Sequence, residues 1–146
     1  HRTLPGDYDI AELLKIDTEG GWIYFTASPD HMGQRYLYRA PLSGFGDKVR
    51  LTPEGYTGTN AYKISDDGRH AVHTHSSFMQ PPQYRLIALE THRVLETFED
   101  NQALIDRIAA LDLGTHEFFQ VQAQDDLTLD SYIIYPPDFD PAKQYP

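Results

Sequence analysis

Residues 15–20 read Lys-Ile-Asp-Thr-Glu-Gly, and residues 63–68 read Lys-Ile-Ser-Asp-Asp-Gly. The two stretches align without gaps at an offset of 48 residues, which also aligns Thr26 with Thr74, Tyr36 with Tyr84 and Ala40 with Ala88. A four-strand unit that recurs every ~40–50 residues is typical of a β-propeller blade. Two similar hairpins in a β-sandwich are the alternative interpretation.

Each repeat unit contains four short strand patterns. We expect strands near residues 10–16, 22–27, 35–41 and 48–51 in the first unit, and near 60–64, 70–76, 84–89 and 94–98 in the second. The turns at residues 18–21 and 66–69 carry glycines, which can supply the positive φ of a tight hairpin. The sequence therefore predicts a mostly β fold with two four-stranded antiparallel blades, at residues 1–52 and 53–100. A propeller closes with roughly four to eight blades, so we expect a longer parent protein.

The pattern changes after the second unit. Asp100 and Asn101 offer a helix N-cap, and Leu104, Ile108 and Leu111 recur at helical spacing. Gly114 is predicted to stop this helix. We expect a short connector helix within residues 101–116 and a domain boundary near Asn101.

Strand patterns resume at residues 117–124 and 128–135, joined by a turn at Asp125 and Asp126. The prolines that follow, Pro136, Pro137 and Pro141, cannot donate to a β-ladder, so that segment is predicted to be an extended crossover. A strand left without a partner exposes unpaired backbone groups. We therefore expect the chain to be a fragment in which residues 117–146 begin a truncated second domain.

Four stretches, taken in order, resemble the dipeptidyl peptidase IV branch of the prolyl oligopeptidase family of serine peptidases. They are residues 21–27, residues 35–39 with 51–55, residues 64–69 with 73–77 and 81–82, and residues 117–119 with 136–141 and 145–146. In that family a propeller of about eight blades caps an α/β-hydrolase domain. The resemblance implies that residues 1–100 are the last blades and residues 117–146 the first strands of the hydrolase domain. Many relatives carry His where this chain has Asn60, and Pro-Asp-Gly where it has Asp66-Asp67-Gly68; both changes keep polar or turn-compatible chemistry.

The resemblance implies that the parent is a serine exopeptidase, which releases N-terminal Xaa-Pro or Xaa-Ala dipeptides through an acyl-enzyme. The nucleophile of such a hydrolase sits in a Gly-x-Ser-x-Gly elbow. None of the serines has these neighbours; they are Ser28, Ser43, Ser65, Ser76, Ser77 and Ser131. In the family the catalytic triad lies beyond the equivalent of Pro146, and the substrate-binding glutamates lie before that of His1. We therefore assign no catalytic residue, substrate-binding residue or cofactor to this chain and expect it to be inactive alone. The alternative is a non-enzymatic propeller that serves as a binding or scaffold module.

Two clusters invite a metal interpretation. His73 and His75 share a strand face and could bind zinc with a third ligand, whereas His70 points the other way; we favour the alternative that both are buried and hydrogen-bonded. The acidic residues 125–130 could suggest calcium, but they lack the glycine of a calcium loop, which favours a solvated hairpin tip. We therefore predict no metal site. The alternating aromatic residues Trp22, Tyr24, Tyr36 and Tyr38 are expected to pack the sheet.

Composition limits the partners. The net charge of −10 argues against a nucleic-acid backbone and an anionic membrane surface. The sequence has no cysteine, which excludes disulfides. We expect peptide substrates to bind through other parts of the parent, and the open blade edges to cause self-association. The parent is expected to be a homodimer, with a periplasmic or secreted location favoured over a cytoplasmic one.

Overall fold

The computed structural model describes residues 9–28 and 33–145. Residues 1–8 of the predicted first blade, and Pro146, lie outside the described residues. The chain divides into two compact units, His1–Ile105 and Asp106–Pro146. The described residues are mostly β, with strands in both units and one short helix between the strands.

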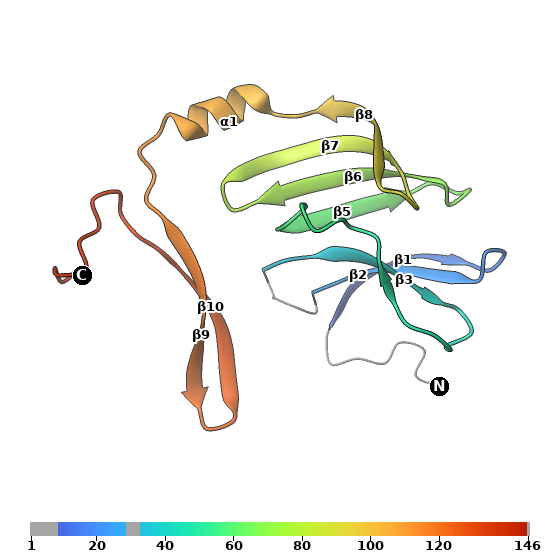
Figure 1. Ribbon diagram of the computed structural model, residues 1–146, viewed down its shortest axis with the longest axis horizontal. Helices are drawn as coiled ribbons and strands as arrows, with labels where there is room; N and C mark the ends of the chain where they lie inside the picture. The colour runs from blue at the N-terminus through green and yellow to red at the C-terminus, as the bar shows by residue number, and fades with distance from the viewer. Residues whose placement is uncertain (1–8, 29–32, 146) are drawn as a thin grey trace. The chain divides into compact units, whose positions relative to one another are not determined.

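Two four-stranded antiparallel sheets make up the first unit (Figure 1). The first sheet has the order β1 (Ile10–Asp17), β2 (Trp22–Ala27), β3 (Tyr36–Pro41) and β4 (Val49–Arg50). The second has the order β5 (Thr59–Ile64), β6 (His70–Ser77), β7 (Gln80–Ala88) and β8 (Arg93–Glu99). Both sheets meander in sequence order, which confirms the predicted four-strand units.

The turns have the backbone conformations that their glycines suggested. Gly21 has a φ of 74° and Gly68 a φ of 67°, a region that costs glycine little. In the second sheet, the Asp67 carboxylate accepts hydrogen bonds from the Ser65 hydroxyl at 2.6 Å and the Arg69 backbone N–H at 3.0 Å. These bonds hold the pKa of Asp67 below its ordinary value.

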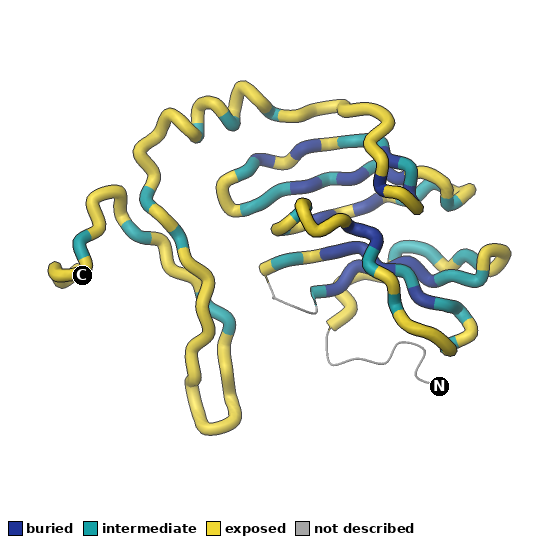
Figure 2. Tube along the Cα trace, in the orientation of Figure 1, coloured by how far each residue is buried: buried dark blue, intermediate teal, exposed yellow. Residues whose placement is uncertain are grey.

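The two sheets share a hydrophobic core. It contains Tyr24, Leu37 and Leu51 from the first sheet and its following segment, and Tyr62, Ala71, Ile87 and Leu89 from the second sheet and its turn. Figure 2 shows buried residues gathered in these sheets. A second cluster, with Ile23, Phe25, Ala27, Tyr36, Tyr38 and Ala40, lies on the opposite face of the first sheet. The four aromatic residues predicted to pack the sheet do so, divided between its two faces.

The repeat changes register in its third strands. Ile23 pairs with Ala40 in the first sheet, whereas Ala71, its counterpart 48 residues later, pairs with Ile87. The offset is therefore 47 residues in β3 and β7, and the alignment of Tyr36 with Tyr84 and of Ala40 with Ala88 is wrong by one position. The connections differ, because β2 and β3 are joined through residues 28–35 but β6 and β7 through Phe78 and Met79 alone.

Strand β7 begins at Gln80, four residues earlier than predicted. Its ladder pairs Ser77 with Gln80 and then His75 with Gln83. Pro81 and Pro82 therefore both lie within the irregularity opposite Ser76. A bulge can accommodate residues that have no N–H to give to the ladder.

Helix α1 (Gln102–Ala109) begins where the cap residues predict. The Asp100 carboxylate accepts a hydrogen bond from the Gln102 N–H at 3.0 Å. The helix ends five residues before Gly114, so the prediction that Gly114 stops it is wrong. A Cβ at Gly114 would overlap the carbonyl oxygen of Tyr135, so this glycine permits close backbone approach. In the described part of the chain, no helix has the length and hydropathy needed to cross a membrane.

The second unit contains a two-stranded antiparallel sheet, β9 (His116–Gln124) with β10 (Leu127–Ile134). Most residues of both strands are exposed, as Figure 2 shows. The large apolar side chains among them include Phe118, Val121, Tyr132 and Ile134.

Candidate functional site

Three imidazoles and two phenols lie together in the first unit. His73 and His75 come from β6, Tyr62 from β5, His92 from the β7–β8 turn and Tyr56 from the segment before β5. We call these five residues the histidine cluster. The rings of Tyr62 and His73 stack at 4.7 Å between centroids, and His92 meets His73 edge to face at 4.7 Å. Tyr56 contacts the rings of all three histidines.

Asn60 fixes the hydrogen bonding of His73. The amide nitrogen of Asn60 donates to the carbonyl oxygens of Arg35 and Tyr56, both at 2.9 Å. Since carbonyl groups only accept, the remaining amide atom is the oxygen, and it accepts from Nε2–H of His73 at 2.8 Å. His73 is therefore neutral with its proton on Nε2, while its buried Nδ1 has no hydrogen-bond partner.

A second chain of bonds links the two sheets through Tyr62. Its hydroxyl lies 2.9 Å from Nε2 of His92 and 2.8 Å from Oγ1 of Thr52, just after β4. Thr52 Oγ1 also accepts the backbone N–H of Leu37, in β3, at 2.7 Å. His75 donates from Nε2 to the carbonyl of Thr57 at 2.7 Å. Buried polar groups bonded in this way tie the sheets to their linker.

Burial governs the ionisation of the cluster. Desolvation, with smaller contributions from His92, His75 and Arg85, lowers the pKa of His73 to about 3. Desolvation likewise lowers the pKa of His92 to about 4. Burial also raises the pKa of Tyr62 well above its ordinary value. At neutral pH all three groups are uncharged, so Tyr62 is poorly suited to act as a nucleophile.

The residues that the sequence suggested as possible metal ligands make hydrogen bonds to other protein groups or lie on opposite faces of a strand. Nε2 of His73 and of His75 is bonded to a protein oxygen, and His70 is exposed on the opposite face of β6. At the β9–β10 hairpin, Asp130 accepts a hydrogen bond from Gln120 across the ladder at 2.9 Å. Among the described residues, no three His, Cys, Asp or Glu side chains gather in a geometry that could hold a metal ion.

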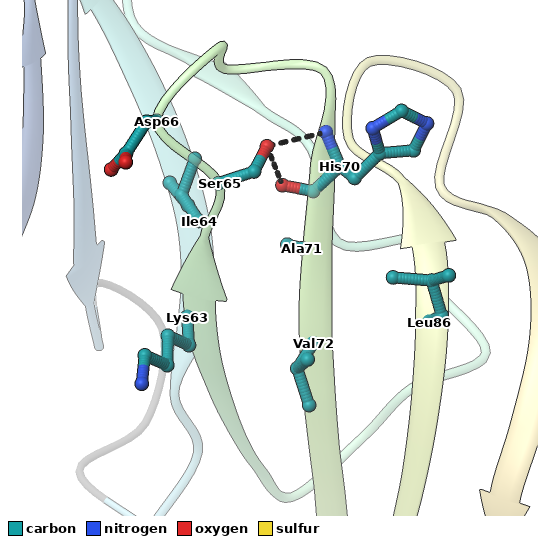
Figure 3. A pocket seen from close by; sticks show the side chains of 8 residues that line it. All are labelled: Lys63, Ile64, Ser65, Asp66, His70, Ala71, Val72 and Leu86. Carbon is teal, nitrogen blue, oxygen red and sulfur yellow. Dashed lines mark hydrogen bonds between the residues drawn. The ribbon is translucent and has the colours of Figure 1, made fainter.

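The open face of the second sheet carries a pocket of about 390 Å³. It is lined by Lys63, Ile64, Ser65, Asp66, His70, Ala71, Val72 and Leu86 (Figure 3). The hydroxyl of Ser65, which donates to Asp67, accepts the His70 backbone N–H at 3.1 Å and lies 3.0 Å from the His70 carbonyl oxygen. Ser65 is thus engaged in the turn and not with an imidazole ring, which leaves the pocket without an activated nucleophile.

The sequence placed part of this site and missed the rest. Strand periodicity put His73 and His75 on one face and His70 on the other, and their burial agrees. His92 was missed because it lies in the tight β7–β8 turn, where its φ is 54°, and its ring meets Tyr62 and His73 only in the folded sheet. Histidine is among the residues enriched at positive φ. A histidine in the short segment between two predicted strands was therefore the sequence signal that could have pointed to His92.

Comparison with known proteins places the chain in a family. The family model described as the dipeptidyl peptidase IV N-terminal region matches residues 3–82. The chain is 27% identical over 144 residues to dipeptidyl peptidase 4 of Trichophyton rubrum, which covers 97% of this chain and 18% of the relative. It is 30% identical over 146 residues to the probable dipeptidyl-aminopeptidase B of Aspergillus clavatus, which covers 97% of this chain and 15% of the relative.

A solved structure gives the same result. The crystal structure of Porphyromonas gingivalis dipeptidyl peptidase 4 matches with a TM-score of 0.85 and 28% identity, over 99% of this chain and 20% of that chain. The chain thus spans about a fifth of the length of such relatives. With more than half of its residues matched by the family model, the chain belongs to the dipeptidyl peptidase IV family.

Proposed function

We propose that the longer protein containing this chain is a serine exopeptidase of the dipeptidyl peptidase IV type. It would remove dipeptides from peptide N-termini and prefer Pro or Ala in the second position. The observation that supports this most strongly is the match to P. gingivalis dipeptidyl peptidase 4, which extends over 99% of the chain at 28% identity. The activity belongs to the whole protein, of which this chain supplies a small share.

We assign separate roles to the two ends of the chain. Residues 1–100 would form the last two blades of a propeller, because two meandering four-stranded sheets share one core. Residues 117–146 would begin an α/β-hydrolase domain. An isolated two-stranded hairpin is marginally stable, and the exposed apolar side chains of β9 and β10 are consistent with further sheet packing there. Residues 101–116 would connect the two.

The chain itself is proposed to be non-catalytic. None of its serines stands in a Gly-x-Ser-x-Gly elbow. The imidazoles of His73 and His75 are bonded to an amide and a carbonyl oxygen, whereas a catalytic histidine must face its nucleophile. The histidine cluster would therefore hold the two blades together, while the triad and the groups that bind the peptide's amino end come from other parts of the protein.

We also propose that the isolated chain self-associates through open strand edges. Strand β8 is the last strand of its sheet, and all seven of its residues are exposed. An unpaired edge offers backbone donors and acceptors to another chain. Sedimentation that shows a monomer at high concentration would argue against this.

For the longer protein, we propose a homodimer that is located in the periplasm or outside the cell.

Active-site labelling tests the enzymatic proposal. A fluorophosphonate reacts covalently with the activated serine of a serine hydrolase. We expect the longer protein to be labelled at one serine that lies after residue 146, and the 146-residue chain to remain unlabelled. A longer protein that takes up no label and has no Gly-x-Ser-x-Gly elbow would support the binding or scaffold module instead.

A further inference from the structure

The chain leaves the second sheet at the end of β8 and passes directly into helix α1 (Figure 1). The last backbone pair of the β7–β8 ladder is Tyr84 with Glu99. Asp100 and Asn101 follow, and α1 begins at Gln102. If the antiparallel register continued, these two residues would lie opposite the two that precede Tyr84 in β7. They are hydrogen-bonded to those two residues, but through side-chain amides where a ladder would use backbone N–H groups.

Gln83 holds the end of β8 from inside the sheet. Its Nε2 donates to the carbonyl oxygen of Asp100 at 2.9 Å, and its Oε1 accepts from Nε2 of Gln80 and from Nη2 of Arg85. A guanidinium can only donate, so the Arg85 contact fixes which end of the Gln83 amide faces Asp100. Gln83 is 7% exposed and pairs with His75 of the histidine cluster. The bond to Asp100 is therefore anchored in the buried polar residues of the sheet.

Asn101 continues the sheet with its side chain while its backbone starts the helix. Its Nδ2 donates to the carbonyl oxygen of Pro82. Its backbone N–H donates to Oε1 of Glu99 at 2.8 Å. Its carbonyl oxygen accepts the N–H groups of Leu104 and Ile105, both at 2.9 Å. Asn101 makes these bonds at a φ of 53°, in a region that asparagine adopts more readily than most residues.

The neighbouring residues explain why the Asn101 side chain takes this role. Pro82 has no N–H, so a ladder at this position would leave the Asn101 carbonyl without a donor from β7. The cap of α1 is already supplied by the Asp100 carboxylate, which accepts the Gln102 N–H at 3.0 Å. The amide of Asn101 is therefore not needed as a cap, and it serves the contact with β7 instead.

We propose that Gln83 and Asn101 form an exit joint, which fixes the direction in which the chain leaves the second sheet. All bonds of this joint lie within the first unit, which extends to Ile105, and the β9–β10 sheet follows it in the chain. In the longer protein Asn101 is a positioning residue, which acts through the start of α1 on the segment assigned to the hydrolase domain. This catalytic consequence rests on the proposed function, whereas the joint itself does not.

Amide exchange in the 146-residue chain tests the joint. By NMR we expect the side-chain amide protons of Asn101 and Gln83 to be protected from exchange with solvent. Asn101→Gly keeps the positive φ and Asn101→Asp keeps the shape, but both remove the donor to Pro82, so the Gln83 amide should lose protection. Ala103→Gly, which weakens α1 through helix propensity alone, should leave that amide protected. Unprotected amides in the wild type, or unchanged Gln83 protection in both Asn101 variants, would overturn the joint.

Spin labels measure the direction itself. The sequence has no cysteine, so labels can be placed at Lys63→Cys in β5 and at Leu104→Cys, an exposed position of α1 within the first unit. We expect one narrow distance distribution, which becomes broad in Asn101→Gly and Asn101→Asp and stays narrow in Ala103→Gly. A broad distribution in the unmodified background, or equal widths in all four proteins, would overturn a fixed direction.

Kinetics of the longer protein test the positioning role. Fluorophosphonate labelling reports on the serine nucleophile, whereas turnover of an Xaa-Pro substrate also requires the substrate-binding groups to be in place. We expect Asn101→Gly and Asn101→Asp to lower kcat/KM by roughly ten- to a hundredfold without changing the labelling rate, and Ala103→Gly to change neither. Unchanged turnover, or equal losses of turnover and labelling, would overturn the positioning role.

Failure of the proposed function would look different. A wild-type longer protein that neither turns over the substrate nor takes up the label would overturn that function and the catalytic role of Asn101 with it. The amide-exchange and distance measurements would still decide whether the exit joint exists, because they require no activity.

Discussion

The phenol oxygen of Tyr62 lies 2.9 Å from Nε2 of His92 and 2.8 Å from Oγ1 of Thr52. One side chain from β5 therefore joins the β7–β8 turn of its own sheet to the segment that leaves the first sheet. All three groups are buried. The contact between the two sheets thus includes a polar connection inside an otherwise apolar core.

Removing that hydroxyl should weaken the contact. Tyr62→Phe keeps the ring stacked on His73 but removes the hydrogen-bond partner of His92 Nε2 and one of the two partners of Thr52 Oγ1. A buried polar group that loses its hydrogen bond costs about 1–3 kcal/mol, so we expect the free energy of unfolding to fall by about that amount in urea titrations. Tyr84→Phe, on the open face, is the matched control and should change little. Equal unfolding midpoints for the two variants would show that the Tyr62 hydroxyl adds nothing.

Acid should destabilise the first unit through its histidines. The folded-state pKa values of His73, about 3, and His92, about 4, lie below the ~6.5 of an unfolded chain. The unfolded state therefore binds more protons as the pH falls below ~6.5. The contribution of each histidine to the free energy of unfolding is therefore fully present above pH ~6.5 and is lost as the pH falls toward 4. At pH 5 the loss is on the order of 2 kcal/mol per histidine.

Proton NMR and urea titrations check this prediction. The ring protons of His73 and His92 should not titrate in the folded protein between pH 8 and pH 5. In urea titrations, His92→Gln should flatten the pH dependence of the free energy of unfolding, whereas His70→Gln, at an exposed position, should leave it unchanged. Ordinary titration of both buried rings near pH 6.5 would contradict the account.

Gly114 provides a test in the second unit. Its backbone lies against the Tyr135 carbonyl, and the neighbouring Thr115 carbonyl accepts the Tyr135 N–H at 2.8 Å. Gly114→Ala would force the two segments apart, so the Tyr135 amide should exchange with solvent faster in hydrogen-exchange measurements. Gly55→Ala, where an added Cβ meets no atom within 4 Å, is the control. Unchanged protection of Tyr135 in Gly114→Ala would rule out the close approach.

The sequence predicted the strands and turns correctly because turn glycines, the helix cap and strand alternation depend on residues only a few positions apart. Gly21 and Gly68 adopt the positive φ that their turns require, and the Asp100 carboxylate caps α1 as expected. Alternation along β6 was enough to separate His70 from His73 and His75, because side chains in a strand alternate between faces.

Signals that depend on distant residues were missed. The offset of 48 residues fails in β3 and β7 because the connections before those strands differ in length, which sequence similarity alone does not register. Strand β7 includes Pro81 and Pro82 because its ladder is irregular there. Gly114 is needed by Tyr135, 21 residues later, and His92 enters the cluster only after β7 and β8 pair.

We propose that this chain is a non-catalytic part of a dipeptidyl peptidase. The most direct measurement compares the turnover of a chromogenic Xaa-Pro substrate by the longer protein and by the purified 146-residue chain. We expect release of the N-terminal dipeptide by the longer protein, with a preference for Pro or Ala in the second position, and no turnover by the chain alone. Turnover by the 146-residue chain, or an inactive longer protein, would contradict the account.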